Sequence, residues 1–160
     1  MPVEAPPSPR AYLLDTDHCS YILDGHPGGC GRYGERKGHT RTCVISQGEL
    51  VFMAERSQRV EQNRQAVKSF LDDITVHTVD REVAASYGRL KAALLLSHGP
   101  KAKAKRRQFK LAKLGLKDND LWIAAVALHH SLTVVSGDSA FSRMRVAGVL
   151  VESWITPSES

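Results

Sequence analysis

The chain has 160 residues, of which 42% are hydrophobic, and a net charge of +5 with a pI of about 9.3. This length favours one domain with a single core, and the hydrophobic content excludes an intrinsically disordered chain. No apolar run reaches the roughly 18 residues of a membrane span, which excludes a transmembrane protein. The basic charge favours an anionic partner, with nucleic acid as the first candidate.

The N-terminal segment, residues 1–10, contains four prolines and lacks the apolar stretch of a signal peptide. We therefore expect a flexible lead-in, then one domain over residues 11–156 and a tail over residues 157–160. This organisation favours a cytoplasmic protein.

The three cysteines, Cys19, Cys30 and Cys43, are interleaved with histidines. An odd number of cysteines without a signal peptide predicts free thiols in a reducing compartment. A structural zinc site is the alternative. It is disfavoured because the chain has no C-x-x-C pair and no H-x-x-x-H pair.

The first expected element is a buried strand over residues 12–14, with Asp15 at its carboxyl end. A short helix over residues 18–23 follows, and the glycines and proline of residues 25–29 end it. The polar, basic residues 31–41 are expected to form a loop or a weak helix.

A second strand is expected over residues 42–45, followed by Ser46 as the N-cap of a helix. Glu49 lies three residues after Ser46, which is the capping-box spacing. This helix is predicted over residues 47–56, with Leu50, Met53 and Ala54 on one side.

The middle of the chain predicts a helix over residues 59–71 and a strand over residues 75–79. Asp80 is expected to cap the next helix, which covers residues 81–96. The basic segment 101–113 comes next, and it lacks a consistent apolar stripe.

The last third begins with a buried helix from residue 117 to 128, for which Asp118 is the expected N-cap. A buried strand over residues 132–135 leads into Ser136-Gly137-Asp138, and a final strand covers residues 149–151. Strands alternate with helices throughout. This pattern predicts an α/β fold with a parallel sheet and helices on both faces.

Four acids fall at equivalent places in this pattern: Asp15 and Asp138 follow strands, and Glu49 and Asp120 open helices. All four positions lie at the carboxyl edge of a parallel sheet, where ligands bind. Carboxylates gathered there repel one another, and Mg²⁺ or Mn²⁺ removes this cost. Such a metal supports phosphodiester hydrolysis.

Each acid also has a purely structural interpretation. Glu49 could complete a capping box, and Asp120 could favour the helix dipole. Asp138 could be a turn residue. Asp17 could cap the short helix after Asp15 or support Asp15 as a neighbour.

Five segments, in order along the chain, match motifs of one family. They are Leu14-Asp15-Thr16-Asp17 with residues 18–23, Ser46-x-x-Glu49-Leu50, residues 119–125, residues 134–138 with Phe141, and the closing residues 149–154. Over about residues 11–155 the chain resembles PIN-domain proteins. It looks most like the VapC toxins of bacterial toxin–antitoxin pairs.

This resemblance implies a PIN-like parallel sheet and an endoribonuclease that uses Mg²⁺ or Mn²⁺. It further implies inhibition by a VapB-type antitoxin and frequent homodimerisation. Ser136 stands where the family often has threonine, and Asp17 is expected to support the site. The resemblance assigns metal-binding and catalytic roles to Asp15, Glu49, Asp120 and Asp138.

The chain departs from the family in a basic patch before Glu49 and in a longer basic region before Asp120. We hypothesise that the second region contacts the RNA backbone, which gives affinity that depends on salt and not on sequence. The alternative is a solvated flexible loop. The residues expected to contact RNA are Lys103, Lys105, Arg106, Arg107 and Lys110.

Two other functions fit parts of the sequence. In a HAD-type phosphatase, Asp15 would form an aspartyl-phosphate. Against it, Cys19 stands where that family has threonine or valine, and no second acid follows Asp138 over residues 141–145. The chain could instead be a basic RNA-binding module whose acids are only helix caps.

Overall fold

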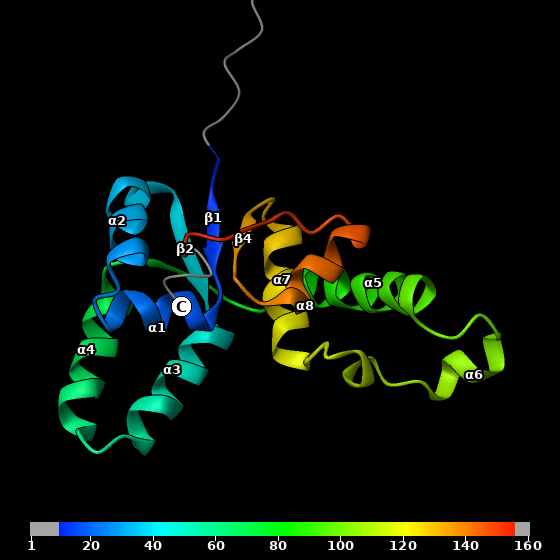
Figure 1. Cartoon of the computed structure of the whole chain (residues 1–160), viewed down its shortest axis with the longest axis horizontal. Helices are drawn as coiled ribbons and strands as arrows, with labels where there is room; N and C mark the ends of the chain where they lie inside the picture. Colours follow the sequence, from blue (N-terminus) through cyan, green and yellow to red (C-terminus); the bar gives the residue numbers. More distant parts are fainter. Residues whose placement is uncertain (1–9, 156–160) are drawn as a thin grey trace, which may run out of the picture.

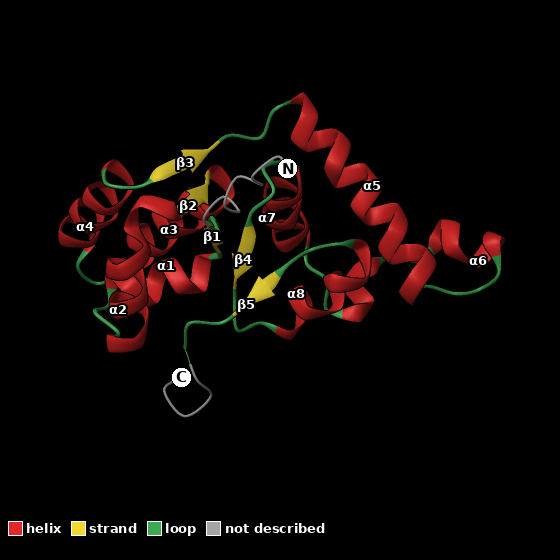
Figure 2. Cartoon of the chain, turned by 90° about the horizontal axis from the view of Figure 1, so that it is seen from above, coloured by secondary structure: helices red, strands yellow, loops and turns green. Residues whose placement is uncertain are grey.

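A computed structural model describes residues 10–155 of the chain. Five parallel strands form one sheet in the order β3-β2-β1-β4-β5, and helices cover both faces (Figures 1 and 2). The predicted α/β fold is confirmed. The expected tail and all of the expected lead-in except Arg10 lie outside the described residues. The strands are β1 (Tyr12–Leu14), β2 (Thr40–Cys43), β3 (Thr75–His77), β4 (Thr133–Val135) and β5 (Val151–Glu152).

The helices form two groups on either side of β1 in Figure 1. The first group is α1 (Thr16–Leu23), α2 (Pro27–Arg36), α3 (Val44–Arg56) and α4 (Val60–Asp72). The second group is α5 (Arg81–His98), α6 (Lys103–Gln108), α7 (Asp118–His129) and α8 (Ser139–Arg143). Short 3-10 helices cover Lys37–His39, Leu111–Leu114 and Met144–Ala147.

The central strand β1 is buried on both faces, as its uninterrupted apolar sequence predicts. Leu13 packs into the core formed with α5 and α7, whereas Tyr12 and Leu14 pack into the core formed with α1, α3 and α4. Leu13 and Leu14 are both fully buried. A shift of one residue would exchange the two cores, so this packing fixes the register of β1.

Strands β1 and β4 end at the same level of the sheet. Leu14 pairs with Val135, and the backbone N–H of Asp15 donates to the carbonyl of Val135 at 3.1 Å. The residues after the two strands, Asp15 and Ser136, therefore emerge on the same edge.

The boundary between β2 and α3 differs from the sequence prediction. The strand ends at Cys43, and the β-branched residues Val44 and Ile45 form the first turn of the helix. The N-cap is Cys43, so the predicted capping box of Ser46 and Glu49 is wrong. The Ser46 hydroxyl instead faces the interior, where it is fully buried.

Three other boundaries were also predicted wrongly. Helix α2 begins at Pro27, because proline has the backbone angle of a first helical residue and needs no N–H bond there. Helix α7 is preceded by Lys117 at the N-cap, so Asp118 lies inside the helix. The last strand is Val151–Glu152 rather than residues 149–151. By contrast, the Asp80 side chain caps α5 as predicted, at 2.9 Å from the N–H of Val83.

Candidate active site

A cavity of about 390 Å³ opens at the carboxyl edge of the sheet, between the start of α3 and the start of α7. Six acidic residues contribute to its wall, and they come from four separate parts of the chain. Its lining consists of Asp15, Thr16, Asp17, Glu49, Lys117, Asp118, Asn119, Asp120 and Asp138.

Asp15 is held rigidly at the end of β1. Its Oδ1 atom accepts the N–H of His18 at 2.8 Å, which caps α1, and lies 3.1 Å from Nδ1 of the His18 ring. Both side chains are almost fully buried. Since the strand and the helix cap both fix Asp15, its position does not depend on a ligand.

A hydrogen bond between two buried hydroxyls joins α1, which carries Asp17, to α3, which carries Glu49. Thr16 at the start of α1 donates to Ser46 in the first turn of α3 at 3.1 Å. Ser46 lies three residues before Glu49, on the same helix. This contact therefore sets the distance between α1 and the helix of Glu49.

Glu49 is oriented from across the cavity. Nδ2 of Asn119 donates to Oε1 of Glu49 at 2.5 Å, although the two residues are 70 positions apart. Asn119 directly precedes Asp120 in the first turn of α7. The bond thus connects the helices of two of the predicted acids.

Asp138 lies in a turn that Ser136 stabilises. The Ser136 hydroxyl accepts the N–H of Asp138 at 3.0 Å, and Oδ1 of Asp138 accepts the N–H of Ala140 at 2.9 Å, which caps α8. Asp138 is exposed, whereas Ser136 is buried. Ser136 therefore positions the acid rather than lining the cavity.

The acids repel one another in the absence of a cation. Burial and then the charges of Asp138, Glu49 and Asp15 raise the pKa of Asp120 to about 6. Burial and the charges of Asp15 and Asp138 also raise the pKa of Asp17. These shifts indicate a concentration of negative charge that the nearby Lys117 offsets only in part.

The donor chemistry of this wall fits Mg²⁺ or Mn²⁺, because hard divalent cations prefer carboxylate oxygens. The residues that could hold such an ion are Asp15, Glu49, Asp120 and Asp138, with Asp17 beside them. Over residues 10–155, however, no three His, Cys, Asp or Glu side chains lie close enough together to hold a metal ion. The wall supplies the ligands without gathering them at one point.

The predicted RNA-contacting residues of the basic segment do not line this cavity. They lie in and after α6, which extends outward from the end of α5 (Figure 1). Lys117, Asn119 and His18 were not predicted from sequence. Asn119 is next to a motif acid, but its partner became evident only from the fold.

The cysteines lie apart from the cavity and are free thiols. Cys19 is fully buried and contacts the Thr42 hydroxyl at 3.5 Å, and Cys30 donates to the carbonyl of Ile22 at 3.5 Å. Burial raises the pKa values of Cys19 and Cys43, so both are thiols in the metal-free protein. Among the described residues, no cysteine belongs to a cluster of three or more possible metal ligands.

A parallel sheet with an acidic cavity at its carboxyl edge is an arrangement suited to a metal-assisted hydrolase. Residues 12–147 match the model of the PIN domain, and the chain belongs to this family. It is 28% identical over 145 residues to ribonuclease VapC2 of Haemophilus influenzae, covering 90% of this chain and 98% of the relative. It is 24% identical over 144 residues to the tRNA(fMet)-specific endonuclease VapC of Shigella flexneri, covering 89% and 97%.

Solved structures share the fold. The chain superposes on DNA-bound VapBC from Salmonella typhimurium with a TM-score of 0.74, at 22% identity, covering 92% of this chain and 100% of the other. For VapBC2 from Rickettsia felis bound to a promoter DNA fragment, the TM-score is 0.69 at 23% identity, with 91% and 99% covered. The resemblance to PIN-domain proteins of the VapC type is thereby confirmed.

Across the described part of the chain, no helix is both long and apolar enough to cross a membrane.

Proposed function

We propose that this chain is an endoribonuclease that hydrolyses RNA at the acidic cavity with Mg²⁺ or Mn²⁺, as the toxin of a toxin–antitoxin pair. The observation that carries the proposal is the placement of Asp15, Glu49, Asp120 and Asp138 around one cavity, where burial and then the charges of the other three acids raise the pKa of Asp120 to about 6. The names of the relatives, which are ribonucleases and a tRNA endonuclease, support RNA as the substrate. A cytoplasmic location is part of the proposal.

The metal, when bound, supplies a Lewis acid for attack on a phosphodiester. The chain's own residues prepare its site. Asp15 is fixed by the cap of α1, Glu49 is oriented by Asn119, and Asp138 is held by the Ser136 turn. Asp120 retains its proton up to about pH 6 in the absence of a cation, so the carboxylate is fully available only above that pH.

We further propose that a VapB-type antitoxin binds the chain, because the solved structures that it resembles are VapBC complexes. Homodimerisation remains a prediction from the resemblance. Size-exclusion chromatography with light scattering measures it directly, with the antitoxin absent and present.

The phosphatase alternative is disfavoured by the environment of Asp15. Its Oδ1 atom is engaged by the backbone N–H and the ring Nδ1 of His18, which leaves only Oδ2 to face a ligand in the cavity. Activity on RNA without activity on a phosphomonoester would exclude the phosphatase.

The test is cleavage of RNA with Mn²⁺ or Mg²⁺ by the wild type, Asp15→Asn and Asp120→Asn. We expect both variants to lose cleavage while they still fold. Asp24→Asn is the matched control, because Asp24 is exposed and lies outside the cavity. Cleavage that persists in both variants, or that EDTA does not affect, would refute the proposal.

A further inference from the structure

The chain between Glu82 and Asp118 contains no acidic residue, although it includes most of α5, all of α6 and the segment that leads to α7. The rest of the molecule mixes both signs of charge. Ten basic residues fall within this acid-free stretch: Arg89, Lys91, Lys101, Lys103, Lys105, Arg106, Arg107, Lys110, Lys113 and Lys117.

The cations of residues 101–113, which we call the basic arm, are not neutralised by any acid in the described part of the chain. Elsewhere Lys37, Arg64 and Lys68 pair with carboxylates at 2.5 to 2.6 Å. In the basic arm no lysine or arginine pairs with a described acid, and no residue of α6 is buried. Seven cations without counterions on one short segment repel one another, and a polyanion relieves this repulsion.

The basic arm is anchored to the domain at both ends. Before it, the His98 ring contacts the carbonyl of Arg143 at 3.1 Å, and after it the Arg143 guanidinium donates to the carbonyl of Leu114. Leu111 and Leu116 are buried in the core shared with α5 and α7. Leu116 lies four residues before Asp120, so the basic arm is tied closely to the acidic cavity.

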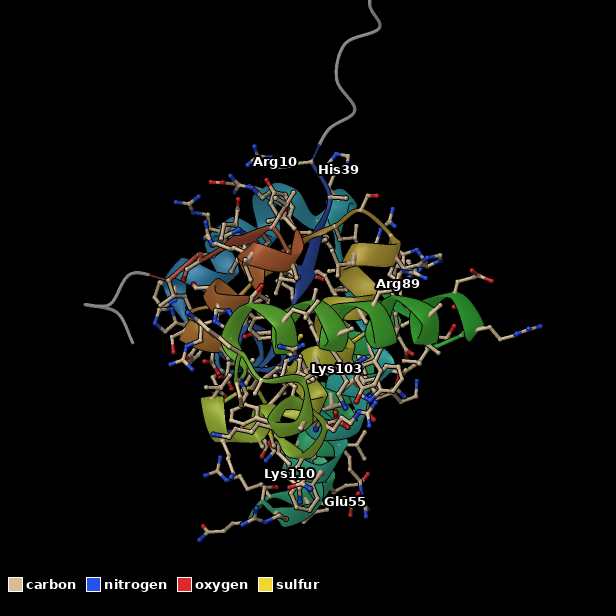
Figure 3. The ribbon with its side chains drawn as sticks, turned by 90° about the vertical axis from the view of Figure 1, so that its right-hand side faces the viewer. Arg10, His39, Glu55, Arg89, Lys103 and Lys110 are labelled. Carbon is tan, nitrogen blue, oxygen red and sulfur yellow. The ribbon has the colours of Figure 1, made fainter. Side chains whose placement is uncertain are left out.

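The basic arm lies on the same end of the molecule as the cavity. The segment from α6 to α7 runs back to the start of α7 along the lower side of Figure 1, where β1 has its carboxyl end. In Figure 3, Lys110 lies toward the end marked by Glu55, whereas Arg10 and His39 lie at the opposite end.

A second groove, lined in part by the basic arm, shares one wall residue with the cavity. It measures about 330 Å³, within the range of small-molecule sites of roughly 300–1,000 Å³. Its wall is mainly apolar and includes Phe109 and Leu95, with Lys91 and Lys110 among its lining residues. Asp118 lines both the groove and the cavity, and Lys91 lies 3.9 Å from its carboxylate, which offsets the charge at the junction.

We propose that the basic arm and this groove form the substrate-binding wall of the site, which holds a single-stranded part of the RNA next to the cleaved bond. The exposed cations neutralise phosphates, and the groove accepts one base beside Phe109. An aromatic ring with lysines around it suits a nucleobase between phosphates. The choice of RNA as ligand rests on the proposed ribonuclease function.

The experiment measures binding without cleavage. The probe is a fluorescent 2′-O-methyl oligonucleotide of about 12 nucleotides, within the usual range of single-stranded sites. Anisotropy is recorded in EDTA from about 50 to about 200 mM salt. Because binding is measured without metal, a wild type that fails to cleave RNA when Mn²⁺ or Mg²⁺ is added would count against the proposed function alone. Unchanged binding in the variants below would count against this inference alone.

The first variant combines Lys103→Gln, Lys105→Gln and Arg107→Gln. Arg106 is left in place because its guanidinium donates to the backbone carbonyls of Pro100 and Lys101. Removing three phosphate contacts should reduce the slope of log affinity against log salt by about 2. The matched control replaces the ion-paired Lys37, Arg64 and Lys68 by glutamine and should keep the wild-type slope.

The second variant, Phe109→Ala, tests the groove. It should weaken RNA binding about tenfold, since stacking on one base contributes about 1–3 kcal/mol. Phe109→Trp should restore binding. Polyglutamate serves as a polyanion without bases, and Phe109→Ala should not change its affinity.

Two results would overturn the inference. One is a wild-type salt slope in the triple glutamine variant. The other is polyglutamate binding as tight as RNA together with wild-type RNA affinity in Phe109→Ala, which would identify the wall as a surface for an acidic peptide.

Discussion

Asn119 donates its side-chain N–H to Glu49 across the mouth of the acidic cavity, at 2.5 Å. This is a contact between two helices that each begin at the carboxyl edge of the sheet. The bond orients Glu49, and its donor Asn119 directly precedes Asp120. Residues that hold a metal-binding group in this way commonly change activity by 10- to 100-fold when they are replaced.

We predict that Asn119→Ala lowers RNA cleavage by about 10- to 100-fold. The variant should also bind Mn²⁺ more weakly, so it should need a higher Mn²⁺ concentration to reach its maximal rate. The Glu49 carboxylate would lose its partner and sample more orientations. Single-turnover cleavage over a range of Mn²⁺ concentrations measures this effect. Asn63→Ala on α4 is the control, since Asn63 lies away from the cavity. Equal activity in the two variants would contradict an orienting role for Asn119.

Asp120 predicts a dependence of stability on pH in the metal-free protein. Its folded pKa of about 6 lies above the ordinary value of 3.8, so the folded state binds the proton more tightly than the unfolded state. The free energy of unfolding should therefore fall as pH rises from about 4 through 6. The expected loss is about 1 kcal/mol, below the full value for such a shift because the side chain is partly solvent-accessible.

Asp120→Asn should remove most of this loss and be more stable than the wild type above pH 6 in EDTA. Mg²⁺ should raise the stability of the wild type more than that of the variant, because the cation neutralises the same repulsion. Urea unfolding at pH 4.5 and pH 7.5 measures both effects. Asp24→Asn is the control for loss of one carboxylate, and a pH profile of Asp120→Asn identical to the wild type would contradict the argument.

The sequence contained enough information for the sheet and for the four acids, but not for their partners. Strands β1 and β4 are apolar runs buried on both faces, so both their existence and the acids after them could be predicted. The boundary at Val44 and Ile45 could not, because β-branched residues favour strands and only packing places these two in the first turn of α3. The role of Asn119 could not be predicted either, since its partner Glu49 lies 70 residues away in the sequence.

The bond between Thr16 and Ser46 predicts a stability effect that should also affect activity. Ser46→Ala leaves the buried Thr16 hydroxyl without its acceptor, and an unsatisfied buried hydroxyl costs about 1–3 kcal/mol. Urea unfolding measures this loss of stability. A lower rate of RNA cleavage would show that Glu49 is no longer held in place relative to Asp15. Ser69→Ala on the exposed face of α4 should change neither quantity. A Ser46→Ala variant as stable as the wild type would show that the hydroxyl pair contributes nothing.

Substitutions of His18 can show whether its ring positions Asp15 or only packs beside it. Its Nδ1 atom lies 3.1 Å from Oδ1 of Asp15, while its Nε2 atom is buried and makes no hydrogen bond with any described residue. His18→Leu removes both nitrogens, so it should lower cleavage about tenfold, while the gain from removing the unpaired Nε2 offsets part of the cost of the lost contact with Asp15. His18→Asn retains a donor near the Nδ1 position and should keep most of the activity. If His18→Leu cleaves RNA as fast as the wild type, the ring only fills space beside Asp15.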